Sequence, residues 1–140
     1  MKVFLAVVAV ATFCGISSAS VMADDDPSST ALSSQGDAEK GKRIFNRCKA
    51  CHNLTAADRH RIGPNLDGLF GRHAGSKDDY KYSKALAEAD FVWTEEKLDH
   101  WLMSPKTFLP GNKMAFAGLR KDDDRKDLIA YLRTATVADE

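Results

Sequence analysis

Two cysteines and a histidine stand close together in the segment Cys48-Lys49-Ala50-Cys51-His52. On a helix, residues three and four positions apart lie on the same face, so both thiols and the imidazole point to one side. This spacing is typical of covalent haem attachment, in which the sulfurs form thioethers with the two vinyl groups and the imidazole ligates the iron. The segment therefore predicts one haem c, attached through Cys48 and Cys51, with His52 as an axial ligand.

Two other chemistries use the same cysteine spacing. A zinc site would need a second pair of ligands, and the third cysteine, Cys14, belongs to an N-terminal stretch that we expect to be removed. A thioredoxin-like redox pair would follow a strand of a βαβ unit, whereas the residues before Cys48 predict a helix. Haem attachment is favoured, and these two chemistries stay open as alternatives.

A second axial ligand would decide what such an iron can do. By residue type, the candidates are His60, His73, His100, Met103 and Met114. The three histidines are typical of loops or surfaces, and Met103 falls on the apolar side of a predicted helix, where methionine usually fills a core. Met114 follows the turn-forming pair Pro110-Gly111, in a loop that could carry a thioether across a haem. The local pattern favours Met114.

The first 23 residues predict a secretory signal peptide. Lys2 precedes an apolar run over residues 3–14, and small residues then allow cleavage after Ala23 or, alternatively, after Ala19. This run is short of the roughly 20 residues that span a bilayer, which disfavours a retained membrane anchor. Residues 24–35, acidic and serine-rich, predict a flexible leader. Residues 36–140 are then the functional domain, and its expected location is the periplasm.

Composition narrows the class of protein. The chain has 140 residues, of which 44% are hydrophobic and 29% charged, as expected for one small globular domain. Twenty basic side chains balance twenty acidic ones, which argues against a nucleic-acid partner bound by bulk charge. Three cysteines are too few for a disulfide scaffold. We expect a monomer.

Apolar residues recur with a helical period and show no convincing strand alternation, which predicts an all-α fold. The first helix is expected from near Asp37, and further helices from Ser83 to Ala89, from Thr94 to before Pro105, and from Asp122 to beside Arg133. Their expected apolar residues are Gly41, Ile44, Phe45 and Cys48, then Leu98, Trp101 and Leu102, then Leu128, Ile129, Tyr131 and Leu132. Two long irregular stretches, 53–76 and 104–121, need something to organise them.

Six motifs occur in a particular order: GDAEKG (36–41), CKACH (48–52), GPNL (63–66), GLFGR (68–72), PGNKM (110–114) and DLIAYL (127–132). With them, residues 36–134 resemble a class I c-type cytochrome, close to mitochondrial cytochrome c and the short bacterial cytochromes c2. The resemblance implies the cytochrome c fold, in which the first and last helices cross, here with Gly41 and Phe45 against Leu128 and Tyr131. Further helices and long loops would wrap one covalently bound haem.

The resemblance also implies roles for individual residues. Met114 would be the second axial ligand, and the Pro64 carbonyl would accept a hydrogen bond from the ring of His52. Arg72, Tyr82 and Trp93 would help to hold the haem propionates. The expected pocket residues also include Trp101, Asn112 and Phe116. The chain departs from the mitochondrial pattern by having Trp101 in place of a tyrosine, Asn112 in place of a threonine and Leu86 in place of an asparagine.

This ligand pair predicts a function. Histidine with methionine raises the reduction potential of the iron and fills both axial positions, which favours a one-electron carrier over a haem peroxidase or a small-ligand sensor. Expected partners are a cytochrome bc-type donor and either a terminal oxidase or a photosynthetic reaction centre as acceptor. Transient docking to these membrane complexes would use basic residues around the haem edge, namely Arg47, Lys49, Lys106, Lys113, Arg120 and Lys121.

Overall fold

The computed structural model describes residues 36–137. Its helices, in chain order, are α2 (Ala38–Phe45), α3 (Lys84–Ala87), α4 (Glu95–Met103), α5 (Pro105–Phe108) and α6 (Asp122–Ala135). In this part of the chain the only strand-like pairing is one bridge between His73 and Val92. The all-α prediction is confirmed. The predicted signal peptide (1–23) and leader (24–35) lie outside the described residues.

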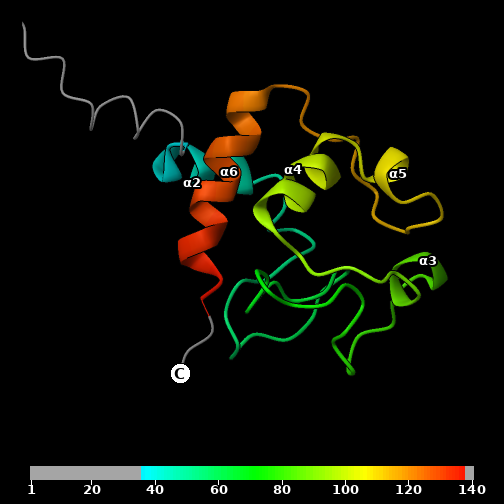
Figure 1. Cartoon of the computed structure of the whole chain (residues 1–140). Helices are drawn as coiled ribbons and strands as arrows, with labels where there is room; N and C mark the ends of the chain where they lie inside the picture. The colour runs from blue at the N-terminus through cyan, green and yellow to red at the C-terminus, as the bar shows by residue number, and fades with distance from the viewer. Residues whose placement is uncertain (1–35, 138–140) are drawn as a thin grey trace, which may run out of the picture.

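Helices α2 and α6 cross and pack closely together, as Figure 1 shows. Gly41 makes the close approach possible, because a Cβ atom there would lie 1.9 Å from the carbonyl oxygen of Asp127. One turn further on, the rings of Phe45 and Tyr131 are in contact, with centroids 5.7 Å apart. The predicted crossing of the first and last helices is confirmed.

The Cys48–His52 motif does not continue helix α2, although the apolar spacing predicted one helical face through Cys48. The helix ends at Phe45, where the N–H of Asn46 bonds to the carbonyls of Arg43 and Ile44 and tightens the chain into turns. These turns keep helix-like bonds, such as the 3.0 Å bond from the N–H of His52 to the carbonyl of Cys48. The two thiols and the imidazole therefore still share one side of the chain.

Helix α4 begins at the side-chain cap of Thr94, which accepts the N–H of Lys97, and buries Leu98, Trp101 and Leu102 as predicted. Pro105, expected to end it, also starts the short helix α5, because proline suits the first position of a helix. An ion pair at 2.7 Å between Arg125 and Asp99 ties α6 to α4. The three helices thereby form one wall around the centre of the molecule.

The long segment between α2 and α3 has no helix and forms the opposite wall, seen as the green loops in Figure 1. Side-chain bonds to the main chain hold these loops. The buried amide of Asn65 donates to the carbonyls of Thr55 and Asp58 at 2.6 and 2.8 Å, and the N–H of Gly68 bonds to the carbonyl of Thr136. The loop wall is thus fixed locally and is also joined to the end of α6.

We predict that Gly41→Ala lowers the free energy of unfolding of the haem-loaded protein by about 3 kcal/mol, since the new methyl group would force α2 away from α6. Guanidinium denaturation would measure the change. Lys42→Ala, an exposed position on the same helix, is the control and should change stability by less than about 0.5 kcal/mol. Equal stability of Gly41→Ala and the wild type would contradict the close-packing account.

Candidate haem site

An apolar cavity of about 340 Å³ lies between the helical wall and the loop wall. Its size falls within the range of pockets that enclose a small molecule. Leucines from both walls line it, including Leu69, Leu98, Leu102 and Leu128. All the residues that the sequence predicted for a haem site line this one cavity: Cys48, Cys51, His52, Pro64, Arg72, Tyr82, Trp93, Trp101, Asn112, Met114 and Phe116.

The ring of His52 is held in one orientation. Its Nδ1–H donates to the Pro64 carbonyl at 2.7 Å, which leaves Nε2 with a free lone pair. Burial lowers the pKa of His52, while the bond to Pro64 partly opposes this shift, so the ring is neutral at neutral pH as a metal ligand must be. Gly63 leaves room for the ring, because a Cβ atom there would lie 2.4 Å from its Cε1.

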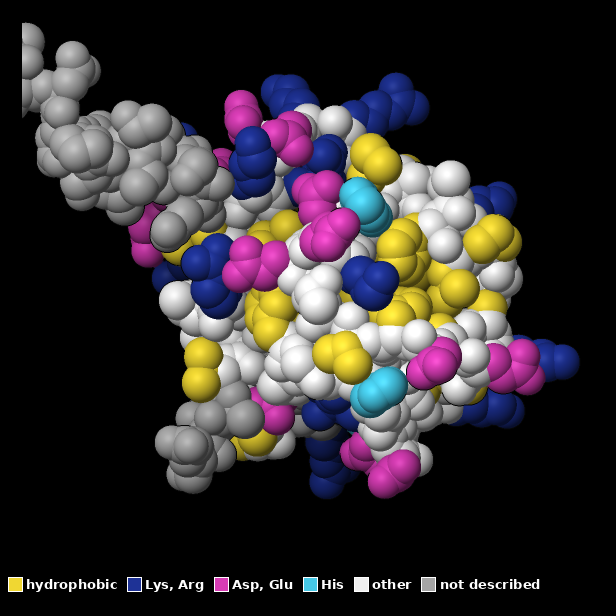
Figure 2. All heavy atoms as spheres, in the orientation of Figure 1, with side chains coloured by type: hydrophobic (Ala, Val, Ile, Leu, Met, Phe, Trp, Pro, Cys, Tyr) yellow, Lys and Arg dark blue, Asp and Glu magenta, His cyan; other side chains and the backbone are white. Residues whose placement is uncertain are grey.

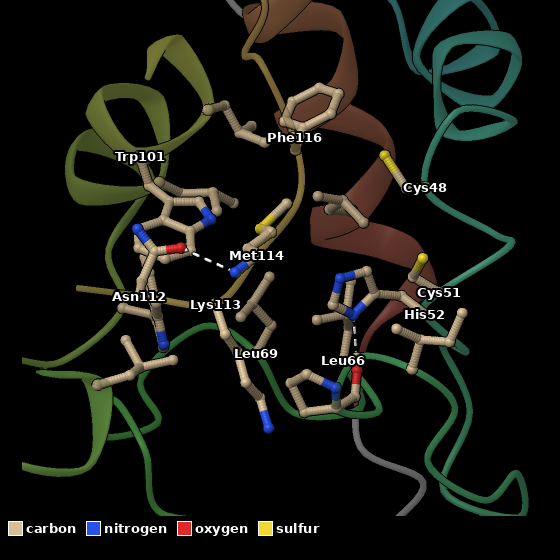
Figure 3. Close-up of a pocket in the computed structure, with 18 of the residues that line it drawn as sticks. Cys48, Cys51, His52, Leu66, Leu69, Trp101, Asn112, Lys113, Met114 and Phe116 are labelled. Carbon is tan, nitrogen blue, oxygen red and sulfur yellow. Dashed lines mark hydrogen bonds between the residues drawn. The ribbon is translucent and has the colours of Figure 1, made fainter. Parts of the chain in front are cut away.

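Met114 reaches into the cavity from the opposite side to His52, with Cys48 and Cys51 beyond the histidine (Figure 3). The other sixth-ligand candidates are placed differently. His60 is bonded on both ring nitrogens, and His100 and Met103 do not line the cavity. His73 borders it but is exposed, whereas Met114 is half-buried. The structure thus pairs an imidazole with a thioether across one apolar space.

Four aromatic rings stand beside the cavity and contact one another edge-on. Trp93 contacts Trp101 at a centroid distance of 5.4 Å, and Phe91 and Phe108 close the group. Both tryptophans are buried, being 7% and 6% exposed, and both line the cavity. Among residues 36–137 neither indole N–H has a hydrogen-bond acceptor. Both indoles can therefore donate to a group that is bound in the cavity.

Arg72 and Tyr82 add polar groups at the same cavity. The guanidinium of Arg72 donates to the carbonyl of Asp67 and to that of Asn65, which anchors it to the loop wall. Burial lowers the pKa of Arg72 and raises the pKa of the Tyr82 hydroxyl, with each side chain partly opposing the shift of the other. Both groups are therefore partly desolvated and available to an anionic group.

The two alternatives to haem fit poorly. Burial raises the pKa of the Cys48 thiol, although the positive charge of Arg47 partly opposes this, whereas a thiol-redox motif needs a lowered pKa. Neither cysteine forms a disulfide with the other. Within residues 36–137, no three histidine, cysteine, aspartate or glutamate side chains are arranged to hold a metal ion. The cavity thus suits a flat, largely apolar group that is bound through sulfur and imidazole.

The predicted docking residues occupy two kinds of position. Arg47 and Lys113 border the cavity, and the other four are exposed outside it: Lys49, Lys106, Arg120 and Lys121. The guanidinium of Arg47 lies 5.6 Å from the ring centroid of Phe116, and Lys113 Nζ donates to the carbonyl of Lys81. On the face seen in Figure 2, basic and acidic side chains are interspersed. Basic side chains therefore form no continuous patch over that face.

Sequence reasoning missed the structural role of His60. Its Nδ1 accepts the N–H of Asn65 at 2.8 Å, and its Nε2–H donates to the carboxylate of Asp79 at 2.7 Å. The ring therefore joins the loop that carries Pro64 to the loop before α3. Tyr80 adds a second link through its hydroxyl, which donates to the carbonyl of Ile62. Only its two hydrogen-bond partners, Asn65 and Asp79, distinguish this histidine from an ordinary loop residue.

Residues 38–136 match the family model described as Cytochrome c. The chain belongs to the cytochrome c family. As a member of this family it carries covalently attached haem c and serves electron transfer rather than catalysis. The thiols, the imidazole, the thioether and the unpartnered indole donors around the cavity are a set of groups that fits this cofactor.

Individual relatives match this chain in sequence along most of their own length. Cytochrome c of Stellaria longipes is 47% identical over 103 residues, which cover 73% of this chain and 95% of the relative. Cytochrome c of Chlamydomonas reinhardtii is 49% identical over 102 residues, or 72% and 91% of the two chains. Cytochrome c-550 of Nitrobacter winogradskyi is 44% identical over 97 residues, or 69% and 89%. The similarity therefore spans mitochondrial and bacterial proteins.

None of the helices in residues 36–137 combines the length and the hydrophobicity that a transmembrane helix needs.

We predict that Asp79→Asn destabilises the protein at neutral pH and that the difference from the wild type shrinks as the pH falls. The hydrogen bond from His60 lowers the pKa of Asp79 below its ordinary value of 3.8. The carboxylate therefore contributes stability above that pH and loses it as the pH falls through the folded-state pKa. Urea denaturation at pH values between about 6 and 3 measures the difference, with exposed Asp78→Asn as the control. A difference that stays constant with pH would contradict the assignment.

Proposed function

We propose that this protein is a periplasmic one-electron carrier that shuttles electrons from a cytochrome bc-type complex to a terminal oxidase or a photosynthetic reaction centre. The observation that carries the proposal is the position of His52 and Met114, which enter one apolar cavity from opposite sides beside Cys48 and Cys51. When bound, haem c supplies reversible one-electron transfer at its iron. The protein residues bind the haem, orient the two axial ligands and exclude water.

The residues on the His52 side of the cavity would hold the haem in place. Cys48 and Cys51 would form the two thioethers to the haem, and His52 would ligate the iron through Nε2, because Pro64 accepts its Nδ1–H. Gly63 keeps the space behind the ring free of a side chain. A neutral ring that cannot rotate presents its lone pair in one direction. This favours an electron carrier, in which the ligands should change little between the two oxidation states.

The residues on the Met114 side of the cavity complete the proposed haem site. Met114 would supply its thioether as the second iron ligand, a soft donor that favours the reduced iron. Trp101 and Phe116 cover this side with aromatic surface and keep water out. With His52 and Met114 both bound to the iron, oxygen and peroxide would find no open position. This supports electron transfer over peroxidase chemistry or small-ligand sensing.

Polar side chains at the cavity would bind the haem propionates. Trp93 is a buried residue, and its indole N–H has no acceptor among the described residues. Arg72 offers a positive charge and the rest of its guanidinium donors, and Tyr82 offers a hydroxyl. Partial burial of Arg72 and Tyr82 strengthens their electrostatic interaction with an anionic group, because less water screens it.

The proposed function also includes a periplasmic location and transient binding to membrane redox complexes. Residues 1–23 direct export to the periplasm and are removed, residues 24–35 form a leader, and residues 36–140 are the cytochrome domain. Docking to the membrane complexes is transient and uses Arg47, Lys49, Lys106, Lys113, Arg120 and Lys121. The relatives named cytochrome c and cytochrome c-550 support an electron-carrier role of this type. Neither a nucleic-acid partner nor a permanent membrane anchor is part of the proposal.

The first test of this function is Met114→Ala in the haem-loaded protein. Loss of the thioether should lower the reduction potential, abolish the red absorption band of the iron(III)–methionine bond and let carbon monoxide bind the reduced form. Redox titration and absorption spectra measure these changes. Met103→Ala is the matched control, since that methionine is 48% exposed on α4 and does not line the cavity. Unchanged spectra and potential in Met114→Ala would refute the axial assignment.

The docking proposal is tested by reversing single charges. Lys106→Glu should slow reduction by a purified cytochrome bc-type complex by about threefold to tenfold at low salt, because electrostatic steering is lost. High salt should remove most of this difference. Lys42→Glu on α2 makes the same charge change at an exposed position that was not predicted to dock. Equal rates for the two variants at every ionic strength would reject the docking surface.

A further inference from the structure

The segment that carries Met114 has very little main-chain support. Between α5 and α6, residues 112–121 form no helix or strand. Among the described residues, the main-chain groups of residues 113–118 make a single hydrogen bond, from the N–H of Met114. The first main-chain bond beyond them is from the N–H of Leu119 to the carbonyl of Leu102. A proposed axial ligand thus stands on one of the least hydrogen-bonded segments of the domain.

The acceptor of that single bond is the side chain of Asn112. Its Oδ1 accepts the N–H of Met114 at 2.9 Å, drawn as a dashed line in Figure 3. Its Nδ2 donates at 2.8 Å to the carbonyl of Pro105 and at 2.8 Å to that of Leu109. One amide therefore connects the start and the end of α5 to the main chain of Met114.

These three bonds occupy both donors and the acceptor of the Asn112 side chain with main-chain groups of its own loop and of α5. Both amide hydrogens and the amide oxygen have main-chain partners, although the side chain is half-buried and lines the cavity. Asn112 therefore acts on the loop, and Trp101 is left as a neighbouring polar donor toward the cavity. Asn112 thus lines the cavity while its amide bonds to the main chain of its own loop and of α5.

Few side chains could replace this amide. Aspartate keeps the acceptor for Met114 but has no hydrogen to donate and would place a negative charge beside two carbonyl oxygens. Serine can accept the N–H two residues ahead in the same kind of turn, but it offers one hydrogen in place of two. Alanine removes all three bonds. These variants therefore separate the acceptor function of Asn112 from its two donor functions.

We propose that Asn112 is a positioning residue that keeps the Met114 thioether in the cavity by fastening its loop to α5. The inference rests on the proposed function, in which Met114 is an axial ligand. Without the three bonds, residues 113–118 gain conformational freedom and Met114 leaves the cavity more often. The expected consequence is faster entry of an external ligand to the position that Met114 holds.

The test is the rate at which cyanide binds the oxidised, haem-loaded protein, followed by loss of the iron(III)–methionine absorption band. Asn112→Ala and Asn112→Asp should accelerate this reaction by about tenfold or more, since several net hydrogen bonds are lost. Asn112→Ser restores the acceptor for Met114 and should fall between Asn112→Ala and the wild type. It also serves as the variant to measure if Asn112→Ala or Asn112→Asp does not fold.

Two comparisons make the result decisive. Asn53→Ala removes a similar amide bond, to the carbonyl of Arg59 in the loop wall, and should lower global stability without speeding cyanide binding. If Asn53→Ala accelerates binding as much as Asn112→Ala does, the effect is global loosening and the positioning role is wrong. Rates of all Asn112 variants equal to that of the wild type would also overturn it.

Failure of the proposed function gives a different result. If the wild-type protein lacks the iron(III)–methionine band, or Met114→Ala retains it, then Met114 is not the ligand and the underlying function is wrong. If that band is present and depends on Met114 while the Asn112 variants bind cyanide at the wild-type rate, only the positioning role fails.

Discussion

The structure depends on bringing one imidazole and one thioether, 62 residues apart in the chain, into the same apolar cavity. Closing a loop of that length costs about 4 kcal/mol plus a constant, so a single weak bond between the two ends would not hold them. Packing of other parts of the polypeptide instead holds the two ends of this loop together. The crossing of α2 and α6 places the segment before His52 against the helix that follows Met114, and Gly41 allows that crossing to be close. Packing at some distance from the cavity thus positions the proposed ligand pair, His52 and Met114.

A consequence is that the walls of the cavity can be built with little regular structure. On the loop side, polar side chains replace the bonds that a sheet would make: Asn65 and His60 bond to main-chain groups or to a neighbouring loop, and Arg72 bonds to two carbonyls. On the helical side, the leucines and tryptophans that would otherwise pack against one another line an open space. A cavity of this size would be costly to leave empty, because its lining would lose dispersion contacts. The apolar lining therefore makes haem binding part of the stability of the domain.

Much of this arrangement was predictable from local patterns, and the limits of prediction have a physical origin. The starts of α2, α3 and α4 coincide with the capping side chains Asp37, Ser83 and Thr94, and the apolar face of α4 is buried as its spacing indicated. The end of α2 at Phe45 and the existence of α5 were missed, since turns and four-residue helices leave no periodic signal. The bonds of His60 and Asn112 were missed for another reason: their partners are main-chain groups or distant loops, which residue types do not identify.

On the Met114 side of the cavity, this chain differs from the mitochondrial cytochromes that it resembles. Relative to the mitochondrial pattern, a tyrosine is replaced by Trp101, a threonine by Asn112 and an asparagine by Leu86. The amide of Asn112 bonds to three main-chain groups, and the Leu86 side chain has no polar atom. Among the three substituted side chains, the indole N–H of Trp101 is therefore the main donor available toward the cavity. A buried water needs two to four polar partners, and these side chains offer few. Fewer polar groups beside the haem would disfavour the extra positive charge of oxidised iron, which is the direction in which the proposed methionine ligand also acts.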